Sequence, residues 1–296
     1  MAIIYNPNQR IFTLHTKHST YQMKVDSLGY LLHLYYGAKN NSSMEYVLTY
    51  ADRGSSLDAL PQEFPTLGIG DYRNIALNIK NARGIESVDL QYQRYEIRKG
   101  KYALQGLPAV WADEAEAETL EIVLADENAG IEVHLLYGVL EEVDVITRSA
   151  VIRNVGTETV TIEKAAAACL DFVSGNYDVI RFYGKHAFER SPERTALGHG
   201  TIAFGSGTSS HQYNPAVILA EQGTTEEAGN CYGMLMVYSG NFSCEAERDQ
   251  YNQTRLLMGL NDELFSYPLS YIVNASSPVA HSDTKICQPT YNTPTD

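Results

Sequence analysis

The sequence predicts an all-β protein, built as one large antiparallel β-sandwich with little helix. Apolar and polar residues alternate with a period of two in many short segments, which is typical of strands with one buried face. Clusters of Gly, Asn, Asp, Ser and Pro separate these segments and indicate hairpin connections. Helical periodicity is confined to the short run 163–168, so a sandwich is favoured over mixed classes.

In the first half, the loops 126–130 and 154–156 each join two alternating segments and predict two hairpins in tandem. The alternation in 88–97 predicts a strand with one solvated face. Residues 37–60 form a long polar excursion, too irregular for a core element. The strands expected in this half are, in order, 11–15, 21–25, 31–36, 75–79, 88–97, 119–124, 131–139, 145–152 and 157–162.

The second half repeats the pattern with shorter segments. No internal repeat and no Pro, Gly or Ser-rich linker divides the chain, so residues 1–275 are expected to form one domain. Residues 276–296 are rich in Ser, Thr, Pro and Asn, and we expect a disordered or divergent tail there. The strands expected in this half are 179–183, 201–204, 216–220, 233–238, 242–248 and 255–258.

Composition excludes several classes of function. The formal charge of −14 argues against a nucleic-acid binder and against attraction to anionic membranes. The four cysteines show no C-x-x-C spacing, which predicts buried thiols and neither a metal nor a cofactor. The start lacks a basic segment followed by an apolar run, and no later segment approaches 18 consecutive apolar residues. We therefore expect a cytoplasmic protein.

The stretch 61–73, PQEFPTLGIGDYR, combines prolines, glycines, aromatic residues and charges and predicts an ordered loop. Its apolar side chains favour packing on a sheet, and its acidic residues and Arg73 predict an internal carboxylate–guanidinium pair. Two interpretations are open: a structural corner, or a loop that also presents Asp71 and Arg73 to a sugar.

This stretch resembles the PQEYP-x-x-G-x-x-D-[FY]-R segment of microbial α-galactosidases of glycoside hydrolase family thirty-six. The resemblance continues, in the family's order, up to about Leu269. The blocks that carry it are KGKYALQGLPAVW (99–111), EAETLEIVLAD (116–126), DVITRSAVIRN (144–154), LDFVSGNYDVIRFYG (170–184), TSSHQYNPAVILA (208–220), VYSGNF (237–242) and DQYNQTRLLMGLND (249–262).

The resemblance implies the amino-terminal β-supersandwich of such an enzyme, truncated before the catalytic barrel. In that family both catalytic aspartates lie in a (β/α)₈ barrel, and no β/α alternation occurs in this chain. We therefore assign no catalytic residue. The resemblance implies subunit contacts in a homo-oligomer or association with a barrel domain, and the rim of an α-galactoside site such as one for melibiose or raffinose.

Within that resemblance, Asp52 and Arg53 match a pair that borders a neighbouring subunit's galactose pocket in tetrameric members. This sequence is shorter there, because Gly54-Ser55 leads directly to Ser56-Leu57-Asp58. An exposed loop aspartate is the other interpretation. The residues expected to act as structural parts of the family motifs are Glu63, Asp71, Arg73, His211, Gln212, Asn214 and Asn241.

Residues 209–215, SSHQYNP, place Ser210 beside His211, but adjacent residues on an extended chain point to opposite faces. We expect His211 and Gln212 to make structural hydrogen bonds in a buried loop. Residues 238–242 predict a tight turn, in which Asn241 is structural or faces a sugar. Glu189-Arg190 and Glu193-Arg194 are typical of a solvated or interface ion-pair cluster.

Three functions are consistent with the sequence. The first is a non-catalytic amino-terminal domain of an α-galactosidase. The second is a free-standing carbohydrate-binding or scaffold sandwich. The third is a hydrolase complete in this chain, which requires a pair of carboxylates such as Glu63, Asp71 or Asp178 in a cleft.

Overall fold

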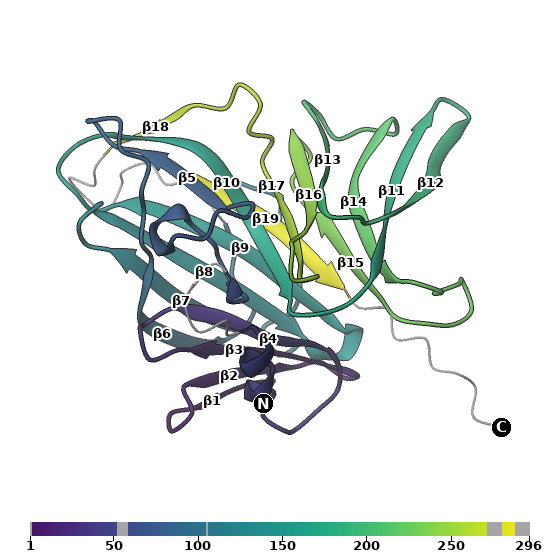
Figure 1. The fold of residues 1–296 in the computed structure, drawn as a ribbon, viewed down its shortest axis with the longest axis horizontal. Helices are drawn as coiled ribbons and strands as arrows, with labels where there is room; N and C mark the ends of the chain where they lie inside the picture. The colour runs from purple at the N-terminus through teal and green to yellow at the C-terminus, as the bar shows by residue number, and fades with distance from the viewer. Residues whose placement is uncertain (1, 52–58, 105, 271–279, 288–296) are drawn as a thin grey trace.

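The computed structural model describes residues 2–51, 59–104, 106–270 and 280–287. The described residues form three antiparallel sheets, so the predicted all-β class is confirmed (Figure 1). Their only α-helix, α1 (Leu48–Ala51), has four residues. Three short 3-10 helices accompany it among the described residues: η1 (Glu45–Val47), η3 (Leu67–Ile69) and η4 (Glu141–Val143).

The first sheet contains four strands that pair in sequence order, as successive hairpins do. Its strands are β1 (Ile3–Asn6), β2 (Ile11–His15), β3 (Ser19–Val25) and β4 (Leu31–Ala38). Buried side chains alternate with polar ones only in part, because β3 and β4 are covered on both faces.

The second sheet has six strands and is organised around its longest strand, β10 (Val160–Phe172). Its other strands are β13 (Gly200–Ser206), β16 (Phe242–Arg248), β17 (Thr254–Gly259), β18 (Tyr267–Leu269) and β5 (Leu77–Lys80). β10 pairs with β17 along one part and with β5 and β18 along the other.

The third sheet has nine strands, and β12 and β6 are its two edges. Its order is β12 (Phe188–Ala196), β11 (Tyr177–Lys185), β14 (Tyr213–Glu221), β15 (Cys231–Met236), β19 (Ala280–Cys287), β9 (Val145–Asn154), β8 (Ile131–Leu140), β7 (Ala117–Asp126) and β6 (Gln91–Lys99). Strands β11 to β14 stand at the upper right of Figure 1, away from the four-stranded sheet.

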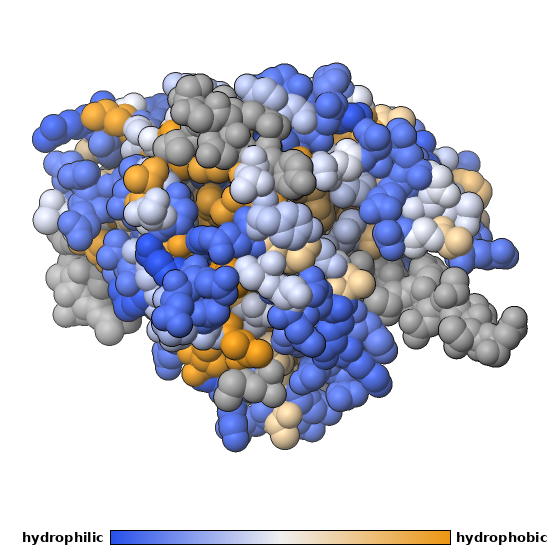
Figure 2. All heavy atoms as spheres, turned by 60° about the horizontal axis from the view of Figure 1, so that its bottom comes forward, coloured by the Kyte–Doolittle hydropathy of each residue, from blue (hydrophilic) through white to orange (hydrophobic). Residues whose placement is uncertain are grey.

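One apolar core joins the three sheets. Phe12 of β2, Leu120 of β7, Ile162 of β10 and Leu256 of β17 belong to the same buried cluster. Each such side chain contributes roughly 1.5–3 kcal/mol of transfer free energy when fully buried. The face seen in Figure 2 is mostly polar, with apolar residues gathered in a few separate patches.

Three elements differ from the sequence-based expectation. The run 163–168 lies inside β10, because pairing with neighbouring strands overrides the helix propensity of its alanines. β12 was expected only as a charged cluster, since its residues are almost all exposed and do not alternate. β6 is more exposed than expected, with seven of its nine residues exposed, although Tyr92 and Tyr95 contact Phe12 of β2.

A further difference concerns the segment 276–296. Its residues 280–287 form β19, which pairs with β9 on one side and β15 on the other. Without it, both strands would present unpaired backbone groups in the middle of the sheet. The structure therefore contradicts disorder for these eight residues, while a divergent tail and the domain boundary at 275 stay predictions.

Candidate functional site

The loop 61–73 begins by joining the four-stranded sheet. Gln62 forms an isolated bridge with Leu32 of β4, and the Glu63 amide donates to the Leu31 carbonyl at 3.0 Å. Successive side chains on an extended segment point in opposite directions. Gln62 and Glu63 therefore enter two different buried polar clusters.

The first of these, the Glu63 cluster, consists of Glu63, Tyr21 (β3), His33 (β4), Tyr137 (β8) and Arg148 (β9). Glu63 is fully buried, and its Oε1 lies 2.7 Å from Arg148 Nη2. Tyr21 Oη lies 2.7 Å and 2.8 Å from the two carboxylate oxygens, and Tyr137 Oη donates to Oε1 at 2.9 Å. His33 Nδ1 lies 3.4 Å from Oε2. The cluster thus satisfies a buried charge with one guanidinium and two phenols.

The charges of this cluster stabilise one another. Burial opposes ionisation of Glu63, but the Arg148 charge and the groups of His33 and Tyr21 outweigh it and lower the pKa of Glu63. Arg148 also donates to the carbonyls of Cys169 and Glu63. Glu63 is therefore an ionised carboxylate that is fully occupied by donors, unlike a general acid, which must hold a proton near neutral pH.

The second cluster, the Asp71 cluster, consists of Gln62, Asp71, Arg73, Asp171 (β10) and Arg255 (β17). The predicted pair is present: Arg73 Nη2 lies 2.8 Å from Asp71 Oδ2, and Arg73 Nε donates to Oδ1 at 3.0 Å. Arg255 Nη2 reaches Asp71 at 2.8 Å and Asp171 at 2.6 Å. Gln62 Nε2 completes the contacts at 2.6 Å from Asp71.

Burial raises the pKa of Asp71, but the guanidiniums of Arg255 and Arg73 outweigh it, so that its pKa lies below the usual range. Arg73 also donates to Gln253 Oε1 at 2.9 Å and to the Leu60 carbonyl at 2.7 Å. The contacts with Asp171 and Arg255 join the loop to β10 and β17, which are distant in sequence. The geometry supports the structural-corner interpretation for Asp71 and Arg73, which are both buried.

The two glycines of the loop have different roles. Gly70 ends η3 with φ of 83°, a left-handed conformation that favours glycine. Gly68 instead allows close packing, because a Cβ atom there would lie 2.3 Å from the Val88 carbonyl oxygen. Between the buried Asp71 and Arg73, the Tyr72 side chain is 86% exposed.

Sequence reasoning missed the partners of this loop. From the sequence, Arg148 and Arg255 are placed only within predicted strands, and Asp171 is not singled out. The signal was available, because each arginine is a charged residue within an otherwise apolar strand, VITRSAVI or TRLLMG. An arginine in such a run requires a buried acidic partner, but the sequence does not say which one.

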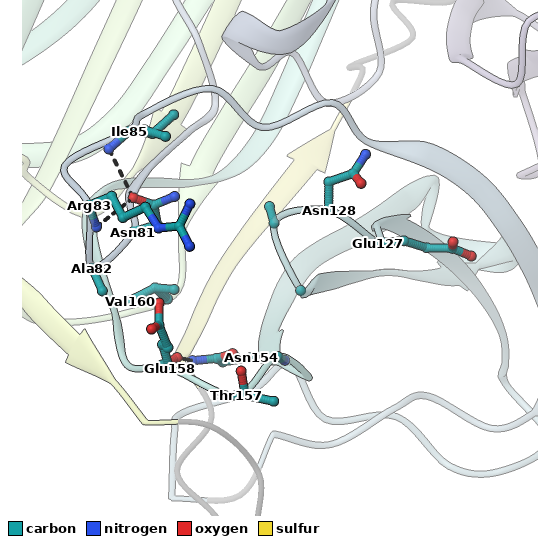
Figure 3. A pocket seen from close by; sticks show the side chains of 13 residues that line it. Asn81, Ala82, Arg83, Ile85, Glu127, Asn128, Asn154, Thr157, Glu158 and Val160 are labelled. Carbon is teal, nitrogen blue, oxygen red and sulfur yellow. Dashed lines mark hydrogen bonds between the residues drawn. The ribbon is translucent and has the colours of Figure 1, made fainter.

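An open hollow of about 500 Å³ lies elsewhere, between three hairpin turns (Figure 3). The turn at Asn81 is held by its Oδ1, which accepts from the amides of Arg83 and Ile85 at 2.9 Å. Asn154 Nδ2 donates to the carbonyls of Glu158 and Leu269 at 2.8 and 2.9 Å. Glu127 and Glu158 stand on separate turns and point in different directions (Figure 3).

The segment 209–215 corrects an expectation. His211 and Gln212 are exposed, so a buried loop was wrong. The segment leads into β14 where that strand extends beyond the core, and the Gln212 carbonyl accepts from the Gly184 amide at 3.1 Å. Asn214 is partly exposed, while Asn241 has a structural contact, since its Oδ1 accepts from the Asn261 amide at 3.2 Å.

The remaining acidic candidates that the structure describes are each paired with an arginine. Asp52 and Arg53 lie outside the described residues. Asp178 is ion-paired with Arg194 at 2.6 Å, and Glu63 and Asp71 are buried against arginines. Within the described residues no group of three His, Cys, Asp or Glu could hold a metal ion, and no helix is long and apolar enough to cross a membrane.

The fold and these clusters define the class of protein: a large all-β domain whose acidic motif residues support the structure. Comparison with known proteins agrees. The model of the Glycosyl hydrolase family 36 N-terminal domain matches residues 29–270. The chain is 76% identical over 285 residues to the bifunctional alpha-galactosidase/sucrose kinase AgaSK of Mediterraneibacter gnavus, covering 91% of this chain and 30% of the relative.

Solved structures give the same result. The galactosidase domain of AgaSK superposes with a TM-score of 0.92 at 71% identity, covering 97% of this chain and 42% of that structure. The alpha-galactosidase AgaB of Geobacillus stearothermophilus gives 0.91 at 36% identity, with 98% and 41% covered. This chain belongs to the glycoside hydrolase family 36 N-terminal domain family. It spans less than half of the length of these relatives.

Proposed function

We propose that this chain acts as the non-catalytic N-terminal domain of an α-galactosidase, an enzyme that hydrolyses terminal α-D-galactosides. The observation that carries the proposal is the match along nearly the whole chain to the galactosidase domain of AgaSK. A free-standing carbohydrate-binding role is not favoured, because the matched length corresponds to a domain of these enzymes.

The geometry of the acidic residues supports a domain that does not supply the catalytic pair of carboxyls. Retaining glycoside hydrolysis requires two carboxyls about 5 Å apart that face the glycosidic bond. The three acids considered for this role, Glu63, Asp71 and Asp178, are each held by an arginine. The domain then contributes to catalysis by supporting the part of the enzyme that holds the carboxyls.

Three finer roles belong to the same proposal. The domain contacts a barrel domain, takes part in a homo-oligomer, and contributes the Asp52-Arg53 loop to the rim of an α-galactoside site. Support for the last role is the match of that sequence to the family pattern, although the loop is shorter here.

The test uses a chimera in which residues 1–287 of this chain, which include β19, replace the matched region of the AgaSK galactosidase domain. We expect the chimera to hydrolyse a chromogenic α-galactoside, whereas the 296-residue chain alone has no turnover. The unmodified galactosidase domain is the positive control. Turnover by the chain alone, or a folded chimera without activity, would contradict the proposed function.

A further inference from the structure

The hairpin formed by β11 and β12 extends beyond the core of the sandwich. Along β11 the side chains change from buried at Tyr177 and Val179 to half-exposed at Tyr183. On β12, eight of nine residues are exposed and the ninth, Ser191, is half-buried. A hairpin with solvent on both faces is marginally stable in water. It is therefore a segment for which a covering partner is expected.

Aromatic side chains gather on one face of this hairpin. In the register of the sheet, Tyr183 is opposite Tyr213 of β14, and Arg181 is opposite Glu193 of β12. The register between β11 and β14 shifts between Arg181 and Tyr183, but all four side chains line the same open cleft. Tyr183 is 45% exposed and Tyr213 is 53% exposed.

Phe204 of β13, a strand of the six-stranded sheet, faces this group across an open cleft of about 380 Å³. We call it the aromatic cleft; its lining includes Arg181, Tyr183, Glu193, Phe204, Tyr213 and Asn214. Arg181 Nε donates to Glu193 Oε2 at 2.8 Å, so the polar groups of the cleft are oriented in advance. The strands that carry its lining residues, among them β11, β13 and β14, stand at the upper right of Figure 1.

The edge of the hairpin is unsuited to pairing with another strand. Pro192 lies in the middle of β12 and charged residues flank it, as in edge strands that resist addition of a further strand. A partner would therefore approach the face that carries the tyrosines rather than the edge. Tyr and Arg are the side chains most enriched among the residues that dominate binding at protein interfaces.

Size and charge favour a protein surface over a single sugar. Phe188, at the tip of the same hairpin, is a further exposed aromatic side chain, with 53% of its surface accessible. The segment 177–196 carries four Lys or Arg against three Asp or Glu, although the whole chain has a charge of −14. The segment is therefore less acidic than the chain as a whole, and it would not repel an acidic partner surface.

We propose that the aromatic cleft is the docking surface for the rest of the galactosidase domain, the part that this chain does not match. More than half of the related galactosidase domain lies outside the matched region, so a large protein partner exists in the relatives. This inference rests on the proposed function and specifies the contact by which the domain supports the enzyme.

The experiment compares the isolated chain with the chimera described above. Hydroxyl-radical footprinting is expected to oxidise Tyr183 and Tyr213 readily in the isolated chain and to show protection of both in the chimera. The double variant Tyr183→Ser/Tyr213→Ser should leave the thermal midpoint of the isolated chain unchanged, because both side chains are on its surface. In the chimera it should increase proteolytic cleavage about thirtyfold, as expected for the loss of one interface hot spot.

Tyr72→Ser is the matched control, because Tyr72 is a more exposed tyrosine that does not line the cleft. If the isolated double variant fails to fold, Tyr213→Ser alone is used. A folded, active chimera with unprotected tyrosines, or equal effects of the control, would overturn the docking surface while leaving the proposed function intact. An inactive chimera would instead count against the proposed function. Protection of the isolated chain by raffinose would identify the cleft as a sugar site and overturn the inference.

Discussion

At the scale of single residues, Glu63 and Arg148 are the most consequential pair. Both are buried completely, and each is the nearest charge of opposite sign to the other. A buried ion pair adds little net stability compared with apolar residues, but the removal of one partner leaves an uncompensated charge. The PQEFP motif therefore carries an acid for structural reasons.

We predict that Glu63→Gln lowers the free energy of unfolding by about 3–5 kcal/mol, because Arg148 then stays buried without a counter-charge. Urea denaturation of the purified chain measures it. Glu142→Gln is the control, since Glu142 pairs with Lys17 on the surface at 3.5 Å and such pairs contribute at most about 1 kcal/mol. Equal effects of the two substitutions would contradict the assigned role of the cluster.

Acid should destabilise the chain through the same carboxylates. The folded-state pKa values of Glu63 and Asp71 lie below their usual values of 4.5 and 3.8. A hydrogen bond from His134 is the largest cause that lowers the pKa of Glu121 to about 2. Because the pKa values of these carboxyls are lower in the folded state, the unfolded chain binds protons at a higher pH than the folded chain does. The stabilisation is thus present above the unfolded-state values and lost below them.

The expected result is a free energy of unfolding that is nearly constant from pH 7 to about pH 5 and then falls steadily toward pH 2. Denaturation at a series of pH values measures this dependence. In Glu121→Gln the decline should be shallower, because one of the linked protons is removed. A profile that rises on acidification would show that these carboxylates are not stabilised in the fold.

At the scale of elements, β10 shows how closely the strands of the second sheet approach. Its residues 165–168 are all alanine, and a Cβ atom at Gly259 of β17 would lie 2.4 Å from the Ala166 Cα atom. Small side chains on both strands are required where the pairing of β10 with β17 is irregular. The local sequence there predicts a helix, whereas the close packing of β10 on β17 requires a strand.

Gly259→Ala should destabilise the chain by about 1–3 kcal/mol, because its new methyl group meets backbone atoms that cannot move without breaking the ladder. Thermal unfolding followed by circular dichroism would detect the change. Gly198→Ala offers a matched comparison, since a Cβ atom there has open space. A larger loss at Gly198 than at Gly259 would be inconsistent with the packing of β10 on β17.

At the scale of the whole molecule, the nine-stranded sheet depends on a strand from the end of the chain. β19 lies between β9 and β15, which come from different halves of the sequence. Deletion of residues 276–296 should expose both edges, lower the thermal midpoint and promote aggregation. Light scattering and size-exclusion chromatography measure this. Deletion of 288–296 alone is the control, and a soluble, equally stable short form would refute the need for β19.

The sequence by itself determined the all-β class, the order of most strands and the family, because period-two alternation and ordered motifs are local signals. It also predicted the Asp71–Arg73 pair, whose members are two residues apart. Only the tertiary structure placed Arg148 on Glu63 and Arg255 on Asp71, since the partners are 85 and 184 residues apart along the chain. The exposure of His211 and the insertion of β19 were decided in the same way, because burial and strand pairing depend on elements distant in sequence.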